Sequence, residues 1–310
     1  MTDRRLVVTE RPTFEQVGDV RRIVENATDR DGVRPLSEHV LLHLRYGGEA
    51  PARNLLLYAD DALAGYAHLD PTDPVEGPSA ELTVGPDHRG RGHGRALVEA
   101  LLAESPDGRL RLWAHGSHPG AAALAESMGF ERIRSLWQMR RSLLQPLPRP
   151  ELPPDVALRT FEIGRDERSW VEVNARAFAD HPEQGAWSID ELKLREREPW
   201  FDPAGFFLAE RGGRLAGFHW TKVHDGDGGA SHGHDPIGEV YVVGVDPDAR
   251  GGGLGRALTL VGLRYLRSLG LSQVMLYVDE SNTAAIRLYE SLGFARFDVD
   301  VMFRRGLTRR

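Results

Sequence analysis

The chain contains 310 residues, of which 41% are hydrophobic and 27% are charged, as in an ordinary soluble protein with room for two cores. Its formal net charge of −7 argues against a nucleic-acid partner, and no apolar run is long enough to cross a membrane. The absence of cysteine excludes disulfides, thiolate metal sites and a cysteine nucleophile. The first residues carry no signal-peptide pattern, so we expect a cytoplasmic protein.

The first half of the chain predicts an α/β domain. Apolar residues recur at helical spacing over 17–24, and hairpin-like strands follow at 55–58 and 65–69. A further strand leads into an Arg/Gly-rich stretch at 84–97. This order fits a mixed, mostly antiparallel sheet with helices on both faces.

The second half repeats this order. A helix-like segment at 170–178 and strands at 205–209 and 217–220 precede another Arg/Gly-rich stretch. Arg89 of the first stretch corresponds to Arg250 of the second, 161 positions later. The repeat is therefore as long as a domain.

Between the repeats lies a segment with five prolines, 145–154, which predicts a stiff and extended connection. We therefore expect two tandem α/β domains, at 1–145 and 155–310, joined by a linker at 146–154. Each is long enough to bury a core of its own.

The Arg/Gly-rich stretch of the second half connects a strand to a helix. The strand over 242–245 ends at Asp246-Pro247, because proline lacks the N–H that a sheet ladder needs. The glycines of 251–255 allow backbone N–H groups to converge at a helix N-terminus, which suits phosphate groups. The spacing matches neither the Walker loop nor the dinucleotide fingerprint, and an ordinary strand-to-helix turn is the alternative.

A second pattern follows downstream. The apolar run 276–278 predicts a short buried strand, and Ser281 or Asn282 would cap the next helix. Apolar and aromatic residues then recur at helical spacing to Leu292, and Gly293 ends the helix. The Arg-x-x-Gly-x-Gly loop, the helix, the strand and the run Asn-x-x-Ala-x-x-x-Tyr-x-x-x-Gly-Phe together resemble the GNAT superfamily of N-acetyltransferases.

The resemblance implies how acetyl-CoA would bind. In this superfamily two neighbouring strands splay apart, and the pantetheine arm of the cofactor enters the gap. Gly244 would form a bulge there and leave the backbone of Val243 and Val245 free to bond the cofactor. Tyr289 occupies the position from which a tyrosine often protonates the leaving thiolate. The first half has Ala125 there, so we expect a non-catalytic N-terminal domain and a catalytic C-terminal one.

Glu239 is the candidate general base. It lies in an otherwise apolar strand that feeds the Arg/Gly-rich loop, where an unpaired carboxylate is costly to bury. Strand alternation predicts that Glu239 shares a face with Val243 and Val245. The first half has Pro78 at the equivalent position. A solvent-exposed glutamate at a strand edge is the alternative.

The likeness extends over nearly the whole chain. The runs 178–185, 200–203, 217–224 and 238–247 look like those of the mycothiol synthase family, whose members are tandem-domain GNAT enzymes. The resemblance implies N-acetylation of the cysteinyl amine of desacetylmycothiol by acetyl-CoA, without a metal. The partner would be this small-molecule amine, and we expect a monomer with no nucleic-acid or membrane partner.

The resemblance also assigns binding residues beside the catalytic pair Glu239 and Tyr289. In the second half, acetyl-CoA would contact Val243, Gly244, Val245, Arg250, Gly251, Gly252, Gly253, Leu254, Gly255, Arg256, Asn282, Thr283, Ala284, Ala285, Ile286 and Arg287. In the first half, a second acetyl-CoA would contact Leu82, Thr83, Val84, Gly90, Arg91, Gly92, His93, Gly94 and Arg95. The acceptor would contact Glu38, Glu183, Lys222, Glu239 and Tyr277. A solvent-facing lysine and a core aromatic residue are the alternatives for Lys222 and Tyr277.

Three histidines invite a metal-site interpretation. His224, His232 and His234 flank a glycine-rich stretch, but their spacing fits no standard zinc pattern, and a flexible loop is the better account. Two other functions stay open, an acetyltransferase for a different amine and a non-catalytic acyl-CoA sensor. An assay of CoA release separates them.

Overall fold

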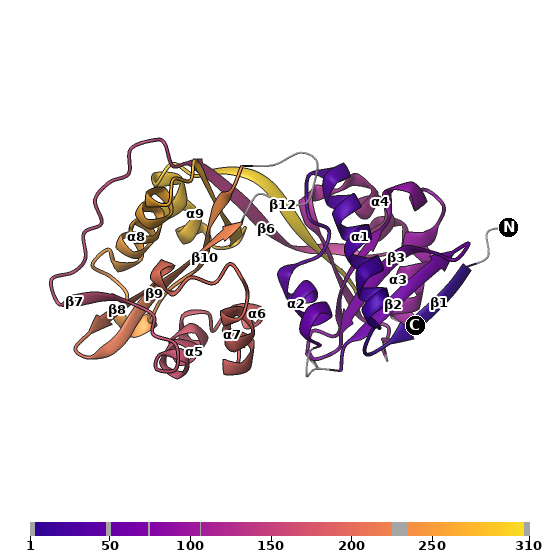
Figure 1. Cartoon of the computed structure of the whole chain (residues 1–310), viewed down its shortest axis with the longest axis horizontal. Coiled ribbons are helices and arrows are strands. Elements are labelled where there is room, and N and C mark those ends of the chain that lie inside the picture. The colour runs from indigo at the N-terminus through magenta and orange to yellow at the C-terminus, as the bar shows by residue number, and fades with distance from the viewer. Residues whose placement is uncertain (1–3, 48–50, 74, 106, 225–234, 307–310) are drawn as a thin grey trace. The chain divides into compact units, whose positions relative to one another are not determined.

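The computed structural model describes residues 4–47, 51–73, 75–105, 107–224 and 235–306. The chain forms two compact units (Figure 1). Unit 1 comprises Met1–Trp137 and Asp298–Arg310, and unit 2 comprises Gln138–Phe297. The chain therefore returns to unit 1 for the end of its last strand.

Unit 1 is built on a sheet that includes this last strand. Its strands are β1 (Arg4–Thr9), β2 (Arg53–Ala59), β3 (Ala62–Asp70), β4 (Ser79–Val84), β5 (Leu110–Ala114) and β12 (Ala295–Arg305). They lie in the order β1-β2-β3-β4-β5-β12. Strands β4 and β5 run parallel, and the other neighbours are antiparallel. The half of β12 that pairs with β5 is Val301–Arg305.

Helices cover both faces of this sheet. They are α1 (Phe14–Asp31), α2 (Glu38–Tyr46), α3 (His93–Ala103) and α4 (Pro119–Ser127), with short 3-10 turns η1 (Pro86–His88) and η2 (His115–Ser117). The alternation of β2 sends Leu56 into a core with α1 and α2. Leu55 and Leu57 point to the opposite face, where they pack with α3 and α4.

Unit 2 has the same plan. Its strands are β6 (Glu131–Ser142, which begins in unit 1), β7 (Val156–Thr160), β8 (Phe206–Arg211), β9 (Arg214–His224), β10 (Ile237–Val245) and β11 (Gln273–Asp279). They lie in the order β6-β11-β10-β9-β8-β7, with β10 parallel to β11. The helices are α5 (Glu167–Ala177), α6 (Pro182–Gly185), α7 (Ile189–Glu196), α8 (Leu254–Ser268) and α9 (Thr283–Ser291), with 3-10 turns η3 (Pro203–Gly205) and η4 (Pro247–Ala249).

The two faces of the unit 2 sheet differ in composition. Under α5 and α7, the ring of Trp170 packs edge-on against Phe206 and Trp220, with centroids 5.6 and 5.8 Å away. Under α8, Leu258 packs against aliphatic residues such as Val245. The aromatic face proves important for the candidate site.

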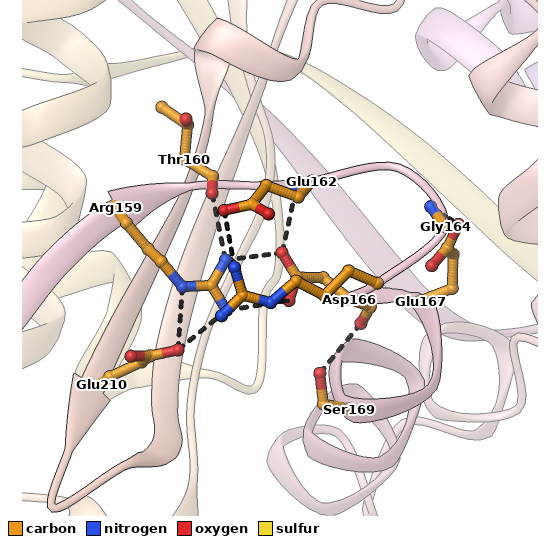
Figure 2. Close-up of polar contacts among 9 residues, drawn as sticks. Arg159, Thr160, Glu162, Gly164, Asp166, Glu167, Ser169 and Glu210 are labelled. Atoms are coloured by element: carbon orange, nitrogen blue, oxygen red, sulfur yellow. Dashed lines mark hydrogen bonds and ion pairs between the residues drawn. The ribbon is translucent and has the colours of Figure 1, made fainter.

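Ion pairs fix the start of α5 (Figure 2). The Arg159 guanidinium of β7 donates to the carboxylate of Asp166 at 2.5 and 2.8 Å and to that of Glu210 at 2.8 Å. The backbone N–H of Glu162 donates to Asp166 as well, at 2.8 Å. Because the buried Asp166 carboxylate has a bidentate partner and a backbone donor, its burial is compensated. The network holds α5 against the sheet.

The structure confirms the expected fold class, a mixed and mostly antiparallel sheet flanked by helices in each unit. The helices expected at 17–24 and 170–178 are α1 and α5, and the expected hairpins are β2–β3 and β8–β9. Within the ranges that the structure describes, no helix is long and apolar enough to span a membrane.

Candidate active site

In both units, two parallel strands separate after a short paired stretch. Strand β10 pairs with β11 only over Gly238–Val240 and Val274–Leu276, although both strands continue. Strand β4 likewise pairs with β5 only over Ser79–Glu81 and Arg111–Trp113. Backbone groups beyond these ladders are available to a ligand on the side of the splay, as the predicted pantetheine site requires.

Left-handed glycines shape the loop that leads to each helix N-terminus. Gly251, Gly252 and Gly253 have φ angles of +102°, +60° and +78°, a region that favours glycine. In unit 1, Gly90 and Gly92 have φ angles of +73° and +80°. Gly253 and Gly92 are the N-caps of α8 and α3, and neither helix has a side-chain cap. The first N–H groups of both helices therefore suit an anion.

One contact, repeated in both units, ties the two helices beside each splay. Arg256 of α8 donates to the Ser291 hydroxyl of α9 at 2.7 Å, and Arg95 of α3 donates to the Ser127 hydroxyl of α4 at 2.7 Å. Asn282 caps α9 as expected. The helices that carry the predicted cofactor residues are thus held together within each unit.

The predicted bulge at Gly244 is wrong. Gly244 stays in register opposite Phe218, and a Cβ added to it would lie 2.8 Å from the Phe218 ring. Glycine is needed there for close packing and not for a bulge. The irregularity of β10 lies instead at Tyr241, between Val240 and Val242.

The bulge reverses the alternation of β10, so the predicted shared face of Glu239 with Val243 and Val245 is also wrong. Glu239 pairs with Lys222, and Val243 pairs with His219. These partners lie an odd number of residues apart, so Glu239 and Val243 point to opposite faces. Val243 and Val245 pack under α8, whereas Glu239 lies on the aromatic face.

Glu239 meets two basic side chains there. Its Oε2 lies 2.6 Å from Nε2 of His224, and Lys222 is its cross-strand partner. The Lys222 ammonium lies 4.2 Å from the centroid of the Trp200 ring and 5.1 Å from that of Tyr241, in cation–π contact with both. Glu239 and Lys222 are both buried, which excludes the solvent-exposed alternatives for them.

Tyr289 is buried in α9, where burial raises the pKa of its hydroxyl to about 12. Its ring packs edge-on against Phe294, with centroids 5.8 Å apart. The corresponding helix α4 of unit 1 carries Ala125 at the equivalent position, as expected from the repeat. At this position of the repeat, unit 2 therefore has a hydroxyl group and unit 1 has none.

The remaining predicted acceptor residues are spread over both units. Tyr277 of β11 is 39% exposed, so it is not a core residue, and its hydroxyl accepts a hydrogen bond from the Gln138 amide at 2.8 Å. Glu38 begins α2 of unit 1, after the N-cap Ser37. Glu183 lies in α6, but its side chain is outside the described residues.

Unit 1 contains a cavity of about 660 Å³ at its own splay, lined by most of the residues predicted to hold a second acetyl-CoA. His93 lines the cavity at the N-terminus of α3, is only 2% exposed, and within the described residues has no partner for either ring nitrogen. Burial and the charge of Arg4 lower the pKa of His93. Apolar walls that include Leu112 and Phe303 suit a pantetheine chain. The cavity therefore offers the N-terminus of α3 to the phosphates of the predicted ligand and apolar walls to its pantetheine chain.

A buried charge cluster lies at the edge of this cavity. His115 Nδ1 lies 2.8 Å from the Asp300 carboxylate, and His115 Nε2 lies 3.4 Å from that of Glu81. Burial alone would lower the pKa of His115, but hydrogen bonds to the two carboxylates raise it to about 10. Glu81 also accepts a hydrogen bond from the Ser37 N–H at 2.6 Å, and Asp300 accepts one from the Gly116 N–H at 2.9 Å. The cluster joins β12 to the centre of unit 1.

Sequence reasoning missed several of these residues. His224 stands two residues after Lys222 on β9, and strand alternation could have placed both on one face. Nothing in the sequence indicates that Tyr241 is bulged or that Asp300 belongs to unit 1. Among the described residues, no group of three possible ligands is arranged to hold a metal ion. His232 and His234 lie outside the described residues.

Comparisons with known proteins agree with this geometry. The model of the acetyltransferase (GNAT) family matches two regions, 22–130 and 168–294. A mycothiol acetyltransferase from Streptosporangium roseum is 62% identical, with 94% of this chain and 96% of the relative covered. A mycothiol acetyltransferase from Thermobispora bispora is also 62% identical, with 97% and 99% covered.

Solved structures show the same fold. A tandem GNAT protein from the clavulanic acid biosynthesis pathway superimposes with a TM-score of 0.76 at 20% identity, covering 99% of this chain and all of that one. A GCN5-related N-acetyltransferase from Sphaerobacter thermophilus gives a TM-score of 0.67 at 27% identity, with 97% and 95% covered.

Proposed function

Because this chain belongs to the mycothiol acetyltransferases of the GNAT family, and is thus an N-acetyltransferase, we propose that it acetylates the cysteinyl amine of desacetylmycothiol with acetyl-CoA. The products are mycothiol and CoA. One observation carries the choice of unit 2 as the catalytic unit. The buried Glu239 carboxylate, with its basic partners Lys222 and His224, lies on the strand that leads into the glycine-rich loop.

The glycine-rich loop and the N-termini of α8 and α9 are proposed to hold acetyl-CoA in unit 2. The backbone N–H groups that follow Gly253 would bind its phosphates, and the strand backbone of Val243 and Val245 would bind its pantetheine arm. Acetyl-CoA supplies an acetyl group activated as a thioester. The residues of the chain then have to orient the amine and accept the proton that it loses.

Glu239 is proposed to take the proton of the amine. An α-amine has a pKa of roughly 7.7–8.0, so a carboxylate acting directly or through one water can deprotonate it. Lys222 is held by two aromatic rings beside this carboxylate, so its ammonium can position an acceptor oxygen. Tyr277 and Glu183 of unit 2 are proposed to bind the acceptor as well, and a contact of the acceptor with Glu38 stays a prediction from the family resemblance.

Tyr289 is proposed to act at the leaving sulfur. Because burial raises the pKa of its hydroxyl to about 12, the phenol stays protonated at every physiological pH. It can therefore donate a hydrogen bond to the departing thiolate as negative charge builds on the sulfur, and the raised pKa keeps the proton on the phenol. In unit 1, Ala125 offers no such group.

Unit 1 is proposed to bind a second acetyl-CoA without transferring its acetyl group. Its cavity, the N-terminus of α3 and the two ring nitrogens of His93, which have no hydrogen-bond partner among the described residues, support binding. The function of the chain would thus divide between a non-catalytic unit 1, which holds most of the expected domain 1–145, and a catalytic unit 2, which holds most of the expected domain 155–310. A cytoplasmic monomer completes the proposal, and light scattering of the purified protein tests the monomer.

The test identifies the acetylated atom. Desacetylmycothiol carries both an amine and a thiol, so the acetylated product is treated with a thiol reagent. The proposal predicts a product that still reacts as a free thiol, and it predicts that E239Q forms little of it. A product with a blocked thiol and a free amine would contradict N-acetylation.

A further inference from the structure

His224 is hydrogen-bonded to the proposed base, Glu239, and the steps proposed above do not use it. It is the last residue of β9, and its Nε2 lies 2.6 Å from Oε2 of Glu239 on β10. The two side chains differ in access to water: Glu239 is 7% exposed, whereas the side chain of His224 is 28% exposed. The imidazole thus stands between a buried carboxylate and solvent.

Among the residues that the structure describes, Lys222 is a second charged group beside Glu239, and it cannot replace His224. Lys222 keeps its ammonium over the rings of Trp200 and Tyr241, where a positive charge is favoured. The Tyr241 hydroxyl in turn accepts a hydrogen bond from the Arg195 guanidinium at 2.8 Å. Lysine and arginine hold their protons near neutral pH, whereas an imidazole both takes up and releases a proton there.

Acetylation creates a need for such a group. The amine arrives as an ammonium ion, and every turnover transfers one proton from its nitrogen to the base. A buried carboxylate that keeps this proton is not ready for the next amine. The base therefore needs a path by which the proton reaches water.

We propose that His224 is this path: it takes the proton from Glu239 through Nε2 and releases one to solvent from Nδ1. One N–H bond of the ammonium breaks and one O–H bond forms on Glu239. That O–H bond then breaks as the Nε2–H bond forms, and loss of the Nδ1 proton and a tautomer exchange restore the neutral ring. No oxidant or further reactant is needed. His224 acts through Glu239 and is a positioning and proton-relay residue, so the inference rests on the proposed function of Glu239.

Two substitutions separate the relay from a purely structural contact. In H224Q, the side-chain amide can still donate a hydrogen bond to Glu239 but cannot carry a proton. In H224A, the ring is removed and leaves space that imidazole from solution can enter. Rates with acetyl-CoA and desacetylmycothiol are measured for both variants and for E239Q, each with and without added imidazole.

The relay predicts a kcat about 10-fold lower in both His224 variants, with the KM of each substrate within about 2-fold of wild type. Imidazole should restore most of the kcat of H224A and none of that of E239Q. An H224Q enzyme with the kcat of wild type would show that the hydrogen bond alone matters and would overturn the relay. Failure of imidazole to rescue a folded H224A would overturn it as well.

A failure of the proposed function would give a different result from a failure of the relay. A wild-type enzyme that leaves desacetylmycothiol unreacted would contradict the proposed acceptor, and the same variants would then be compared with whichever amine the enzyme acetylates. Thermal melting of each variant shows whether it is folded. If H224A does not fold, H224Q still decides between the relay and the hydrogen bond alone.

Discussion

Replacement of Asp300 by asparagine should destabilise unit 1 although Asp300 lies in the last strand of the chain. The Asp300 carboxylate is buried, accepts the Gly116 N–H at 2.9 Å and faces His115 Nδ1 at 2.8 Å. In D300N, the amide oxygen can keep the bond to Gly116. The charge is lost, however, and the same orientation places the amide NH₂ group against the imidazolium, because Oδ1 accepts from Gly116 while Oδ2 faces His115. The reverse orientation would place the NH₂ group against the Gly116 N–H.

The expected loss follows from these contacts. A hydrogen bond to a charged group contributes about 1.5–3 kcal/mol, and breaking a buried ion pair costs about 3–5 kcal/mol. Because Glu81 still partners His115 in the variant, we expect a loss near the lower limit of the second range, about 3 kcal/mol. At roughly 2–4 °C per kcal/mol for a unit of this size, the melting temperature of unit 1 should fall by about 6–12 °C.

Differential scanning calorimetry of the whole chain measures this shift, with D298N as the matched control. Asp298 is two residues away on the same strand, is only partly buried, and accepts the N–H of its neighbour Val299 at 2.8 Å. We expect D298N to change stability by less than about 0.5 kcal/mol. If D300N lowers the free energy of unfolding by less than about 1 kcal/mol, or by no more than D298N does, the charge cluster does not hold β12 in unit 1.

Three further predictions concern single side chains. Y289F should lower kcat by about 100-fold in steady-state assays and leave the KM for acetyl-CoA unchanged, and an unchanged kcat would remove Tyr289 from the mechanism. A125Y should fill the cavity of unit 1, so calorimetric titration should show the loss of one of two bound acetyl-CoA molecules while turnover is retained; two bound molecules would contradict the assignment. The folded-state pKa of His115, raised from 6.5 to about 10, means that its protonation stabilises the fold fully below pH 6.5, and that this contribution disappears as the pH rises through about 10. Urea unfolding should therefore show a difference between wild type and H115Q that shrinks toward pH 10, and a difference that does not change with pH would contradict the raised pKa.

The order of elements could be predicted from the sequence because each is encoded locally. The apolar stripe of α1, the proline that ends each strand before the loop, and the left-handed glycines all act within a few residues. Because the sequence repeats, each element could also be compared with its counterpart in the other half, as for α4 and α9. The roles of Ala125 and Tyr289 could be compared for the same reason.

The face of the sheet on which Glu239 lies could not be predicted from the sequence. Strand alternation holds only while a ladder is regular, and the bulge at Tyr241 depends on how β10 pairs with β9. The same limit applies to His224, whose partner is fixed by that register, and to Asp300, whose partners lie far away in the sequence. The sequence near Glu239, His224 and Asp300 therefore does not identify the partners of these residues.

The most direct test of the central claim is the rate of CoA release from acetyl-CoA with desacetylmycothiol as acceptor, measured beside a panel of other small amines and peptide N-termini. We predict rapid turnover confined to desacetylmycothiol, with a rate at least about 100-fold lower in E239Q. Faster turnover of another amine would contradict the proposed acceptor. Full activity of E239Q would contradict the proposed base.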